Sequence, residues 1–416
     1  MQALLDAVAR DVGTPCYVYL PEVWQARIAT LRSAFAGRFA ISYAVKANPN
    51  PGILRRLRGQ VDGLDVSSGG ELARALDSGW DAARLSFTGP GKSTEELQYA
   101  LDARIGEVIV ESLDEAETLN ALAARTGRRQ AVLARLAPMR VPKGFGLNMS
   151  GKPTQFGLDE ETLDITLPAL IALPHLELVG LHIYSGTQSL SAAAIAENYS
   201  IFVALFRAVC HTYGLRPRKL VFGAGIGIPY HDGETAPDVA AIAAASQPAL
   251  AALASEPTLA GAELVLETGR FLIGEAGVYL TRVIRTKEAR GATLCICDGG
   301  MNHHLAASGH FGSVLQRNYR MFKLGGSATP PPDGTEYTLV GPLCTTIDTI
   351  GRRARFDTLA TGDVIGVLSS GAYGVTASPI HFISHRPPRE VIAEQVDGRV
   401  TIEDCTQFTA PPWRVP

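Results

Sequence analysis

The stretch Tyr43-Ala-Val-Lys-Ala-Asn-Pro-Asn50 decides how the rest of this chain is interpreted. Small and β-branched residues at 40–45 predict a buried strand, and the Asn-Pro-Asn-Pro sequence that follows predicts its end. Lys46 lies at that end. Its amine either reaches solvent from the rim of the strand or is desolvated and forms a Schiff base. These residues alone leave both alternatives open.

Length and composition predict a globular protein with two domains. The chain has 416 residues, of which 46% are hydrophobic, and this is enough to bury two cores. Its 38 basic and 41 acidic side chains give a net charge of −3 without a basic run, which argues against nucleic acid or an anionic membrane as partner. No stretch approaches the ~20 uninterrupted apolar residues of a membrane span, and the first residues lack an export signal, so we expect a cytoplasmic protein.

The cysteines are spread over the whole length, and no pair has C-x-x-C spacing. This pattern argues against a disulfide framework and against a structural zinc site or another bound metal. Strand alternation would place Cys295 and Cys297 on one face, where we expect them to be small core residues. The six cysteines are Cys16, Cys210, Cys295, Cys297, Cys344 and Cys405.

Between residues 40 and 270 the sequence repeats one theme, an apolar strand followed by a helical stretch rich in Ala, Leu and Arg. Eight such units are typical of a (β/α)8 barrel, and the first strand is not followed by the G-x-G-x-x-G of a dinucleotide-binding sheet. We therefore expect an α/β fold with a barrel at 31–274. The predicted strands are Ala40–Asn48, Gly63–Ser68, Arg84–Pro90, Glu107–Ser112, Ala131–Pro138, Glu177–Gly186, Leu220–Gly227 and Glu263–Arg270, with helices such as Gly70–Ser78, Thr94–Asp102 and Ser191–Tyr213 between them.

After Arg270 the pattern changes to strands without intervening helices, which predicts an all-β domain at 275–416. Two segments are irregular. Residues 139–156, rich in Gly, Pro and Lys, follow a barrel strand and should lie over the carboxyl end of the barrel, while residues 323–334 predict a loop. The predicted strands of this domain are Gly277–Lys287, Thr293–Asp298, Thr335–Leu343, Asp363–Ser369 and Glu390–Val396.

Three barrel strands end in residues that can carry chemistry. The seventh ends in Phe222-Gly-Ala-Gly-Ile-Gly227, which predicts either a tight turn or backbone amides wrapped around an anion. Glu267 follows an apolar run and is costly to bury unpaired, so it either forms a salt bridge with Arg270 or serves a site. A lone His in a strand is more often a core residue, but His182 precedes a polar turn at the same end of the barrel.

The sequence Tyr-Ala-Val-Lys-Ala-Asn resembles the pyridoxal-phosphate lysine motif of the fold-III decarboxylases, the family of diaminopimelate, ornithine and arginine decarboxylases. The resemblance extends over seven or more separate segments, from Thr14-Pro to Gly371-Ala-Tyr-Gly374. It implies a barrel of the alanine-racemase type, pyridoxal 5'-phosphate as cofactor, and a homodimer with shared active sites. It also implies that the N-terminal segment 1–30 packs with the C-terminal domain.

The resemblance assigns roles to the polar residues of the barrel. Lys46 would hold the cofactor, Glu267 would bond its pyridine nitrogen, and His182 would stack on its ring. Asp65 and Arg135 lie where the family keeps polar residues near the ring. The residues matched to the phosphate site and its motifs are Gly225, Gly227, Gly269 and Arg270, together with Ser185 or Thr187, because the motif after His182 is two residues longer here.

Two further motifs lie in the predicted β domain. Gly341-Pro-Leu-Cys344 resembles the segment whose Cys enters the neighbouring subunit's site and governs protonation after carbon dioxide leaves, and Tyr373 matches a Tyr that reaches the cofactor. In relatives that act on basic amino acids, an acidic residue follows this Cys and meets the distal amine. Here Thr345 takes that place, and Asp348 is the nearest carboxylate.

These residues predict a pyridoxal-phosphate-dependent carboxy-lyase that removes the α-carboxylate of an amino acid or amino-acid conjugate. With Thr345 in place of the acidic residue, the sequence resembles the branch of the family that acts on carrier-protein-linked glutamate or on conjugated biosynthetic precursors. The alternatives are a decarboxylase of free diaminopimelate, ornithine or lysine, a racemase with a Tyr opposite the Lys, and a non-catalytic relative. Retention of Lys46, Glu267, Arg270 and Cys344 together argues against the last.

Overall fold

The computed structural model describes residues 1–311, 317–327 and 333–408. The chain forms two compact units, each with its own sheet. The barrel unit comprises 27–228 and 236–271, and the β unit comprises 1–26, 229–235 and 272–416. The sequence placed Pro229–Thr235 inside the barrel domain. In the structure, the ring of Tyr230 lies tilted against that of Tyr319 with centroids 4.8 Å apart, and the carbonyl of Tyr230 accepts the amide N–H of Arg320, so this segment packs within the β unit.

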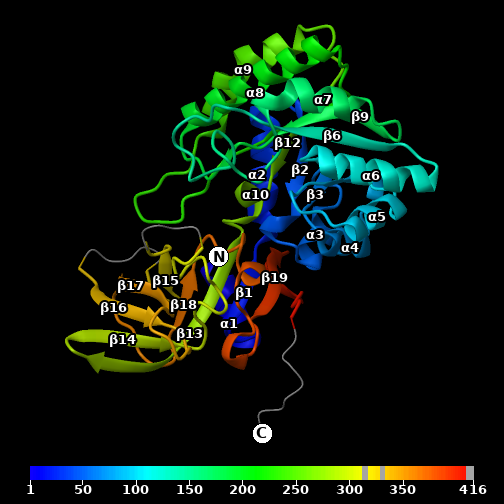
Figure 1. The fold of residues 1–416 in the computed structure, drawn as a ribbon. Coiled ribbons are helices and arrows are strands. Elements are labelled where there is room, and N and C mark those ends of the chain that lie inside the picture. The colour runs from blue at the N-terminus through cyan, green and yellow to red at the C-terminus, as the bar shows by residue number, and fades with distance from the viewer. Residues whose placement is uncertain (312–316, 328–332, 409–416) are drawn as a thin grey trace. The chain divides into compact units, whose positions relative to one another are not determined.

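Eight parallel strands close into the barrel, in the order β2-β3-β4-β5-β6-β9-β11-β12 and back to β2. Figure 1 labels β2, β3, β6, β9 and β12 of this ring. Each strand of the ring overlaps one of the eight predicted strands, so the predicted (β/α)8 fold is confirmed. The strands are β2 (Phe39–Ala44), β3 (Gly63–Val66), β4 (Leu85–Phe87), β5 (Glu107–Val110), β6 (Gln130–Ala137), β9 (Leu176–Ile183), β11 (Lys219–Gly223) and β12 (Glu263–Thr268), with the short β7 (Leu147–Asn148), β8 (Leu158–Asp159) and β10 (Gly186–Thr187) outside the closed ring.

Serine side chains cap the first turn of several helices of the barrel. The side chains of Ser68, Ser93 and Ser112 each accept a backbone N–H three residues ahead, and each such cap stabilises a helix by about 1 kcal/mol. The helices around the barrel are α2 (Pro21–Ala34), α3 (Pro51–Leu57), α4 (Gly69–Asp77), α5 (Thr94–Asp102), α6 (Leu113–Thr126), α7 (Leu163–Ile171), α8 (Ala192–Tyr213), α9 (Val239–Ala254) and α10 (Arg270–Ile273).

Helix α8 is long and apolar enough to cross a membrane by length and composition alone, with a mean hydropathy of 1.4 over 18 residues. Of that window, 61% is buried within the protein. The rings of Phe202 and Phe206 pack on Phe222 of β11, with centroids 5.9 and 5.3 Å apart. The apolar face of α8 is therefore used as core packing against the barrel.

The β unit contains the other sheet, in which β1 (Cys16–Tyr19) pairs antiparallel with β13 and parallel with β19. The predicted β strands are present, and three more were missed. Of these, β17 contains three arginines and β20 has no buried residue, so an apolar pattern could not reveal them. The strands are β13 (Gly277–Ala289), β14 (Ala292–Cys297), β15 (Met321–Lys323), β16 (Thr335–Val340), β17 (Thr349–Phe356), β18 (Val364–Val367), β19 (Arg389–Val396) and β20 (Arg399–Asp404), with helix α1 (Gln2–Asp11) beside them.

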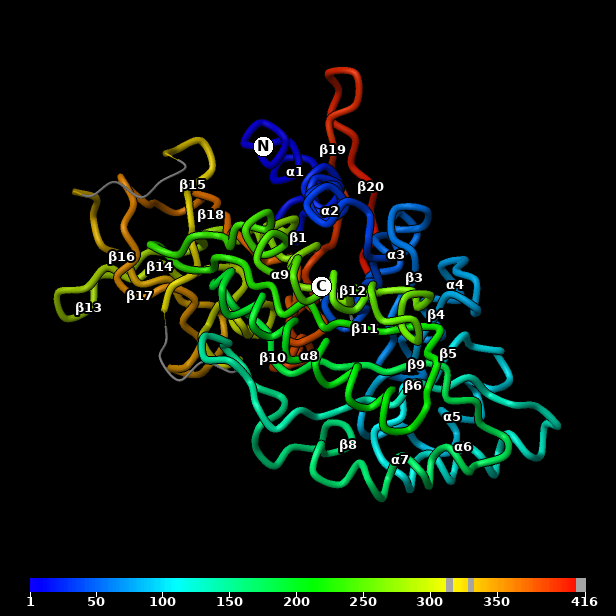
Figure 2. Tube along the Cα trace, turned by 90° about the horizontal axis from the view of Figure 1, so that it is seen from above, coloured from blue at the N-terminus to red at the C-terminus, as the bar shows by residue number. Residues whose placement is uncertain are grey.

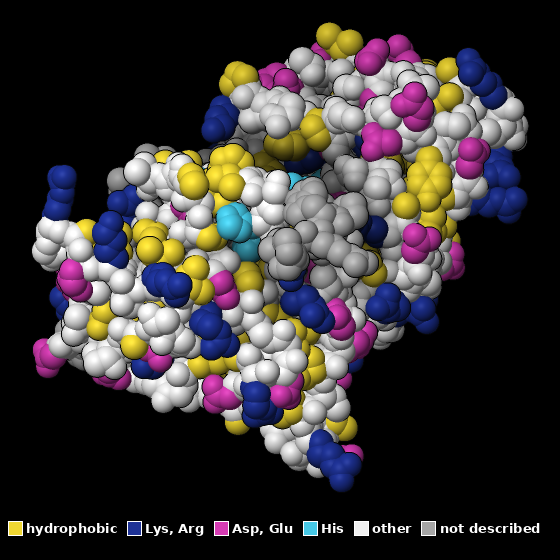
Figure 3. Space-filling view, turned by 90° about the horizontal axis from the view of Figure 1, so that it is seen from below, with side chains coloured by type: hydrophobic (Ala, Val, Ile, Leu, Met, Phe, Trp, Pro, Cys, Tyr) yellow, Lys and Arg dark blue, Asp and Glu magenta, His cyan; other side chains and the backbone are white. Residues whose placement is uncertain are grey.

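Figure 2 shows β19 and β20 as an elongated hairpin. Cys295 and Cys297 of β14 are fully buried, as expected for core residues. Of the loop predicted at 323–334, residues 328–332 lie outside the described part of the chain, and Lys323 belongs to β15. On the face that Figure 3 shows, basic and acidic side chains are interspersed. That mixture agrees with the balanced composition of the chain.

Candidate active site

Lys46 lies at the carboxyl end of the barrel, between two carboxylates. Strand β2 ends at Ala44, and a short 3-10 helix, Val45–Ala47, carries the lysine. Its Nζ lies 3.2 Å from Oε1 of Glu267 and 3.6 Å from Oδ2 of Asp65. Both carboxylates are buried, whereas the lysine side chain is 34% exposed. The amine is therefore held at a fixed place and still faces open space.

Glu267 is the centre of the charge network. Its second oxygen, Oε2, lies 2.8 Å from Nε2 of His182. Burial acts to raise the pKa of Glu267, but Lys46 and His182 outweigh it and hold this pKa below its usual range. Glu267 is thus a carboxylate at neutral pH. The sequence offered Arg270 as its structural partner, whereas the bonds described here join it to Lys46 and His182.

His182 is completely buried near the end of β9. Burial lowers its pKa, against the opposing effect of Glu267. We therefore treat the ring as neutral imidazole, with its proton on Nε2 where it is donated to Glu267. Nδ1 is buried without a hydrogen bond to any described residue. A neutral, flat ring held in this way suits contact with an aromatic ligand.

Asp65 is the second buried carboxyl group, at position three of β3. Its Oδ1 accepts hydrogen bonds from the hydroxyls of Ser86 at 2.9 Å and Thr88 at 2.5 Å. Burial and the negative charge of Glu267 raise the pKa of Asp65 to about 7, although Lys46 acts to lower it. A group with such a pKa exchanges protons readily at neutral pH.

Arg135 lies at the same end of the barrel, on β6, and its partner is a residue that sequence reasoning missed. Its Nη1 donates to both oxygens of Glu111, each at 2.9 Å, and its guanidinium lies over the ring of Phe156 at 4.6 Å. Glu111 directly follows the apolar strand β5, just as Glu267 ends an apolar run. The same signal, a carboxylate after Val-Ile-Val, could have revealed it.

The glycines after β11 and β12 allow close backbone approaches. Gly225 has φ +66, and a Cβ there would lie 2.7 Å from the ring of Phe145. A Cβ on Gly269 would lie 2.9 Å from the carbonyl oxygen of Ala44 and 2.7 Å from Ala47, so a glycine at 269 lets the end of β12 pack against the segment that carries Lys46. A Cβ on Gly227 would likewise lie 2.9 Å from backbone atoms of both Gln188 and Ser189.

The two candidates for the phosphate-binding hydroxyl lie in different surroundings. Ser185 is fully buried, and its hydroxyl donates to Oδ1 of Asn198 at 2.8 Å. Thr187 belongs to β10, which pairs with β7 of the 139–156 segment. Residues of that segment therefore lie over the carboxyl end of β9. The phosphate assignment of Gly225, Gly227, Arg270 and Ser185 stays a prediction.

A cavity of about 210 Å³ lies at this end of the barrel, lined by Lys46, Thr88, Arg135, Phe156, His182, Tyr184 and Glu267 among others. Its chemistry fits pyridoxal phosphate: an amine for the aldehyde, a carboxylate for the pyridine nitrogen and a neutral imidazole for the ring. The buried Nδ1 of His182, without a hydrogen bond to a described residue, leaves a polar atom available for a ligand.

The remaining predicted residues belong to the β unit. The thiol residue Cys344 is exposed, and Thr345 is half-buried. Tyr373 has φ +54, and its ring stacks on Phe311 at 5.9 Å. Asp348 is 2% exposed, and its two oxygens accept the backbone N–H groups of Met301 and Leu343 at 2.7 and 2.9 Å. Its carboxylate thus holds a turn together within this unit.

Comparison with known proteins gives a consistent result. Residues 23–274 match the family model described as pyridoxal-dependent decarboxylase, pyridoxal binding domain. The chain is 33% identical to an L-glutamyl-[BtrI acyl-carrier protein] decarboxylase of Niallia circulans, over 94% of this chain and 91% of that protein. It is 29% identical to a 2-[(L-alanin-3-ylcarbamoyl)methyl]-2-hydroxybutanedioate decarboxylase of Staphylococcus aureus, over 95% and 98%. The crystal structure of diaminopimelate decarboxylase from Helicobacter pylori complexed with L-lysine superimposes with a TM-score of 0.84 at 27% identity, covering 98% of this chain and 97% of that one.

Proposed function

This chain belongs to the pyridoxal-dependent decarboxylases, and we propose that its substrate is an amino acid whose side chain ends in an acyl or acidic group, presented as a conjugate. The enzyme is a pyridoxal-phosphate-dependent carboxy-lyase. What the family does not define is the group at the far end of the substrate. The proposal concerns that group, the residues that would meet it, and the role of each residue at the barrel.

The bound cofactor supplies an electron-accepting ring for the electron pair that the departing carboxylate leaves at Cα. Lys46 would hold the cofactor through Nζ and release it to the substrate amine. Glu267, ionised at neutral pH, would accept a hydrogen bond from the protonated pyridine nitrogen, and the neutral ring of His182 would lie against the cofactor. The glycines Gly225 and Gly227 would bind the phosphate together with Arg270.

The buried state of Asp348 carries the substrate proposal. A desolvated distal ammonium needs a carboxylate close to it. In Gly341-Pro-Leu-Cys-Thr-Thr-Ile-Asp348 the only carboxylate is Asp348, and its two oxygens already accept backbone N–H groups inside the β unit. Thr345 offers a hydroxyl, which cannot neutralise an ammonium group. This segment therefore suits a neutral acyl end better than an amine.

The relatives support the same choice without deciding it. The names of the two sequence relatives described above both specify amino-acid units attached to a larger group, an acyl-carrier protein in one and a hydroxybutanedioate in the other. Diaminopimelate decarboxylases are comparably similar, at 33% identity for the protein of Zymomonas mobilis. A free diamino acid is thus the alternative that an experiment must exclude.

Carbon dioxide release across a substrate panel tests the proposal. The panel contains free lysine, ornithine, arginine, diaminopimelate and glutamate, beside carrier-bound glutamate and amino acids amide-linked to a hydroxydicarboxylate. We expect turnover of a conjugate and poor turnover of every free diamino acid. Efficient turnover of a free diamino acid, with kcat/KM of about 10⁴ M⁻¹s⁻¹ or more, would contradict the proposal and return the distal-amine role to Asp348.

We also propose that the enzyme is a cytoplasmic homodimer in which Cys344 and Tyr373 of one subunit complete the site of the other. The exposed thiol of Cys344 or the amine of Lys46 would deliver the proton that Cα takes up after carbon dioxide leaves. Mixing inactive Lys46→Ala with inactive Cys344→Ala subunits should restore part of the activity, because some heterodimers then contain one intact site. Absence of recovery under demonstrated subunit exchange would contradict shared sites.

A further inference from the structure

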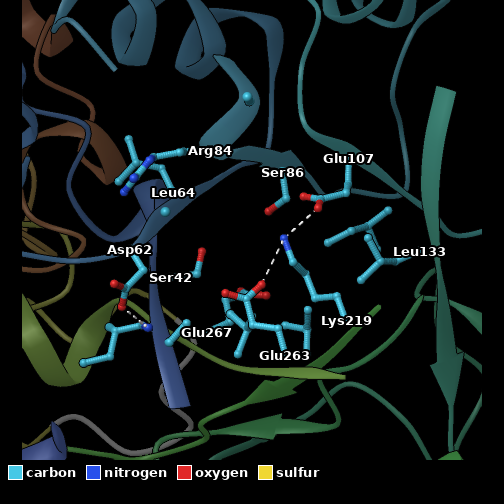
Figure 4. A pocket seen from close by; sticks show the side chains of 17 residues that line it. Ser42, Asp62, Leu64, Arg84, Ser86, Glu107, Leu133, Lys219, Glu263 and Glu267 are labelled. Atoms are coloured by element: carbon cyan, nitrogen blue, oxygen red, sulfur yellow. Dashed lines mark hydrogen bonds and ion pairs between the residues drawn. The ribbon is translucent and has the colours of Figure 1, made fainter. Parts of the chain in front are cut away.

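A second cavity lies inside the barrel, below the site that contains Lys46. It has a volume of about 360 Å³ and lies toward the amino ends of the strands, where Lys219 forms ion pairs with Glu107 at 2.6 Å and Glu263 at 3.8 Å (Figure 4). Water occupies about 30 Å³ per molecule in the liquid, so this space accommodates several molecules. It is larger than the cavity beside Lys46.

The sequence explains why the barrel is hollow on one side. Branched side chains fill the interior from β5, β6, β9, β11 and β12, and they form one hydrophobic cluster of Ile109, Leu133, Val179, Val221 and Val265. The cavity wall on the side of β2, β3 and β4 includes the small residues Ala40, Ser42, Gly63 and Ser86, beside Ile41 and Leu64. Barrels of this type are normally filled by bulky branched side chains from all strands. Here small residues leave space between the aliphatic cluster and β2–β4.

Two carboxyl groups separate this cavity from the candidate site. Glu267 lines both cavities. Asp65 receives one hydrogen bond from each side: Ser86, which lines the lower cavity, and Thr88, which lines the upper one, both donate to its Oδ1. Figure 4 shows Ser86 and Glu267 among the polar groups around the lower cavity. Asp65 itself is 1% exposed, whereas Ser86 is half-buried and so remains in contact with solvent.

We propose that the lower cavity is a proton-entry route, in which water at the amino end of the barrel passes protons through the Ser86 hydroxyl to Asp65 and from there to Lys46. Ser86 is the positioning residue of this route, because its Oγ links the cavity to Oδ1 of Asp65 at 2.9 Å. On the other side, Oδ2 of Asp65 faces Nζ of Lys46 at 3.6 Å. A carboxyl group takes a proton on one oxygen as it gives one from the other, so Asp65 joins the two sides.

The balance of the reaction requires such a supply. Loss of carbon dioxide breaks the bond between Cα and the carboxylate carbon, the electron pair stays behind, and one proton from solvent must finally form the new C–H bond. Each turnover therefore takes up one proton. In the relay, Asp65 is protonated on Oδ2 and gives this proton to neutral Nζ of Lys46, while Ser86 gives its hydroxyl proton to Oδ1 of Asp65. A hydronium ion in the cavity then replaces the proton on Ser86 Oγ and becomes water. The inference rests on decarboxylation but not on the identity of the substrate.

Hydrogen–deuterium exchange of the Asp65 carboxyl group tests the route in cofactor-free protein. The carboxyl band is identified by infrared difference against Asp65→Asn, and its shift is followed after a jump into D₂O near pH 6. We expect fast exchange in the wild type and at least about tenfold slower exchange in Ser86→Val, which removes the hydroxyl and fills the cavity. Ser86→Thr retains a hydroxyl and should exchange like the wild type.

Two further variants separate the relay from a packing effect. Ser42→Ala removes a hydroxyl from the same cavity wall without touching Asp65 and should leave the exchange rate unchanged. Ala40→Leu narrows the cavity while the Ser86–Asp65 hydrogen bond stays intact, so it should slow exchange. If Ser86→Val does not fold, the exchange rate of Ala40→Leu tests the proposal in its place. Wild-type exchange rates in both Ser86→Val and Ala40→Leu would overturn the proposal, since protons would then enter from the upper cavity.

The complete enzyme provides a second measurement. With cofactor bound, Ser86→Val should lower kcat and flatten its pH dependence while KM changes little, and Ser86→Thr should restore both. A rise in KM without a fall in kcat would contradict a proton route. If no substrate released carbon dioxide, the decarboxylase activity itself would fail, while the exchange experiment would still report on the cavity.

Discussion

The two ends of the barrel interior contain the same kinds of charged groups in different surroundings. At the carboxyl end, the side chains of Glu267, Asp65 and Glu111 are no more than 2% exposed. At the amino end, Glu107 is 16% exposed and Glu263 54%. Solvent screens the second set, whereas each carboxylate of the first set interacts strongly with the cation or hydroxyl beside it. Burial, more than residue type, makes one end reactive.

The largest difference in cofactor attachment should appear between variants of Lys46, at the carboxyl end of the barrel, and of Lys219, at its amino end. Lys46→Ala should abolish covalent attachment of the cofactor and lower turnover by at least about 10³-fold, because no other amine lies between Glu267 and Asp65 in the described residues. Lys219→Ala should retain covalent attachment. Borohydride reduction followed by peptide mass analysis measures both, and cofactor fixed to a lysine other than Lys46 would refute the assignment.

A smaller contrast is expected between two carboxylates of the same strand, β12. Glu267→Gln removes the negative charge that would stabilise the protonated pyridine nitrogen and should lower kcat by about 10²–10³-fold. Glu263→Gln, at the exposed amino end, should lower kcat far less. Steady-state kinetics on one substrate compares them. Equal losses in the two variants would mean that Glu267 contributes only to folding.

The free energy of unfolding should respond differently to substitutions at the two ends of β5. Glu111→Gln leaves the buried guanidinium of Arg135 without its carboxylate and should lower the free energy of unfolding by about 3–5 kcal/mol. Glu107→Gln breaks a partly exposed pair with Lys219 and should cost about 0–1 kcal/mol. Urea unfolding followed by fluorescence measures the difference, and similar values for the two variants would show that burial does not govern these pairs.

The last prediction concerns the pH dependence of stability. The pKa of Asp65 is raised from 3.8 to about 7 in the folded protein, where burial, Glu267 and Lys46 act on it. The folded state therefore binds more protons than the unfolded state in this window, so Asp65 makes stability fall as pH rises from 3.8 to about 7. In cofactor-free Asp65→Asn this fall should be weaker by up to a few kcal/mol. An unchanged slope of unfolding free energy against pH would contradict the raised pKa.

Sequence periodicity predicted the barrel well because parallel strands buried on both faces are continuous apolar runs. It predicted that Lys46, His182 and Glu267 lie at the same end of the barrel, because each is a polar residue at or near the end of such a run. Two strands of the β unit, β17 and β20, were missed because charged and exposed residues interrupt any apolar pattern in them. The hydroxyls of Ser86 and Thr88 escaped as well, since nothing in a strand of Leu-Ser-Phe-Thr distinguishes a polar interior position.

The sequence by itself determined the number of barrel strands, the end of the barrel at which polar residues gather, and the lysine that stands among them. These follow from local patterns, because each strand and its terminal residue are adjacent in the chain. Only the tertiary structure decided the partners: Glu267 with His182 and Lys46, Arg135 with Glu111, and Asp348 with two backbone amides. Such pairs join residues from different elements. Their charges and proton affinities depend on burial and distance, which exist only once the chain is folded.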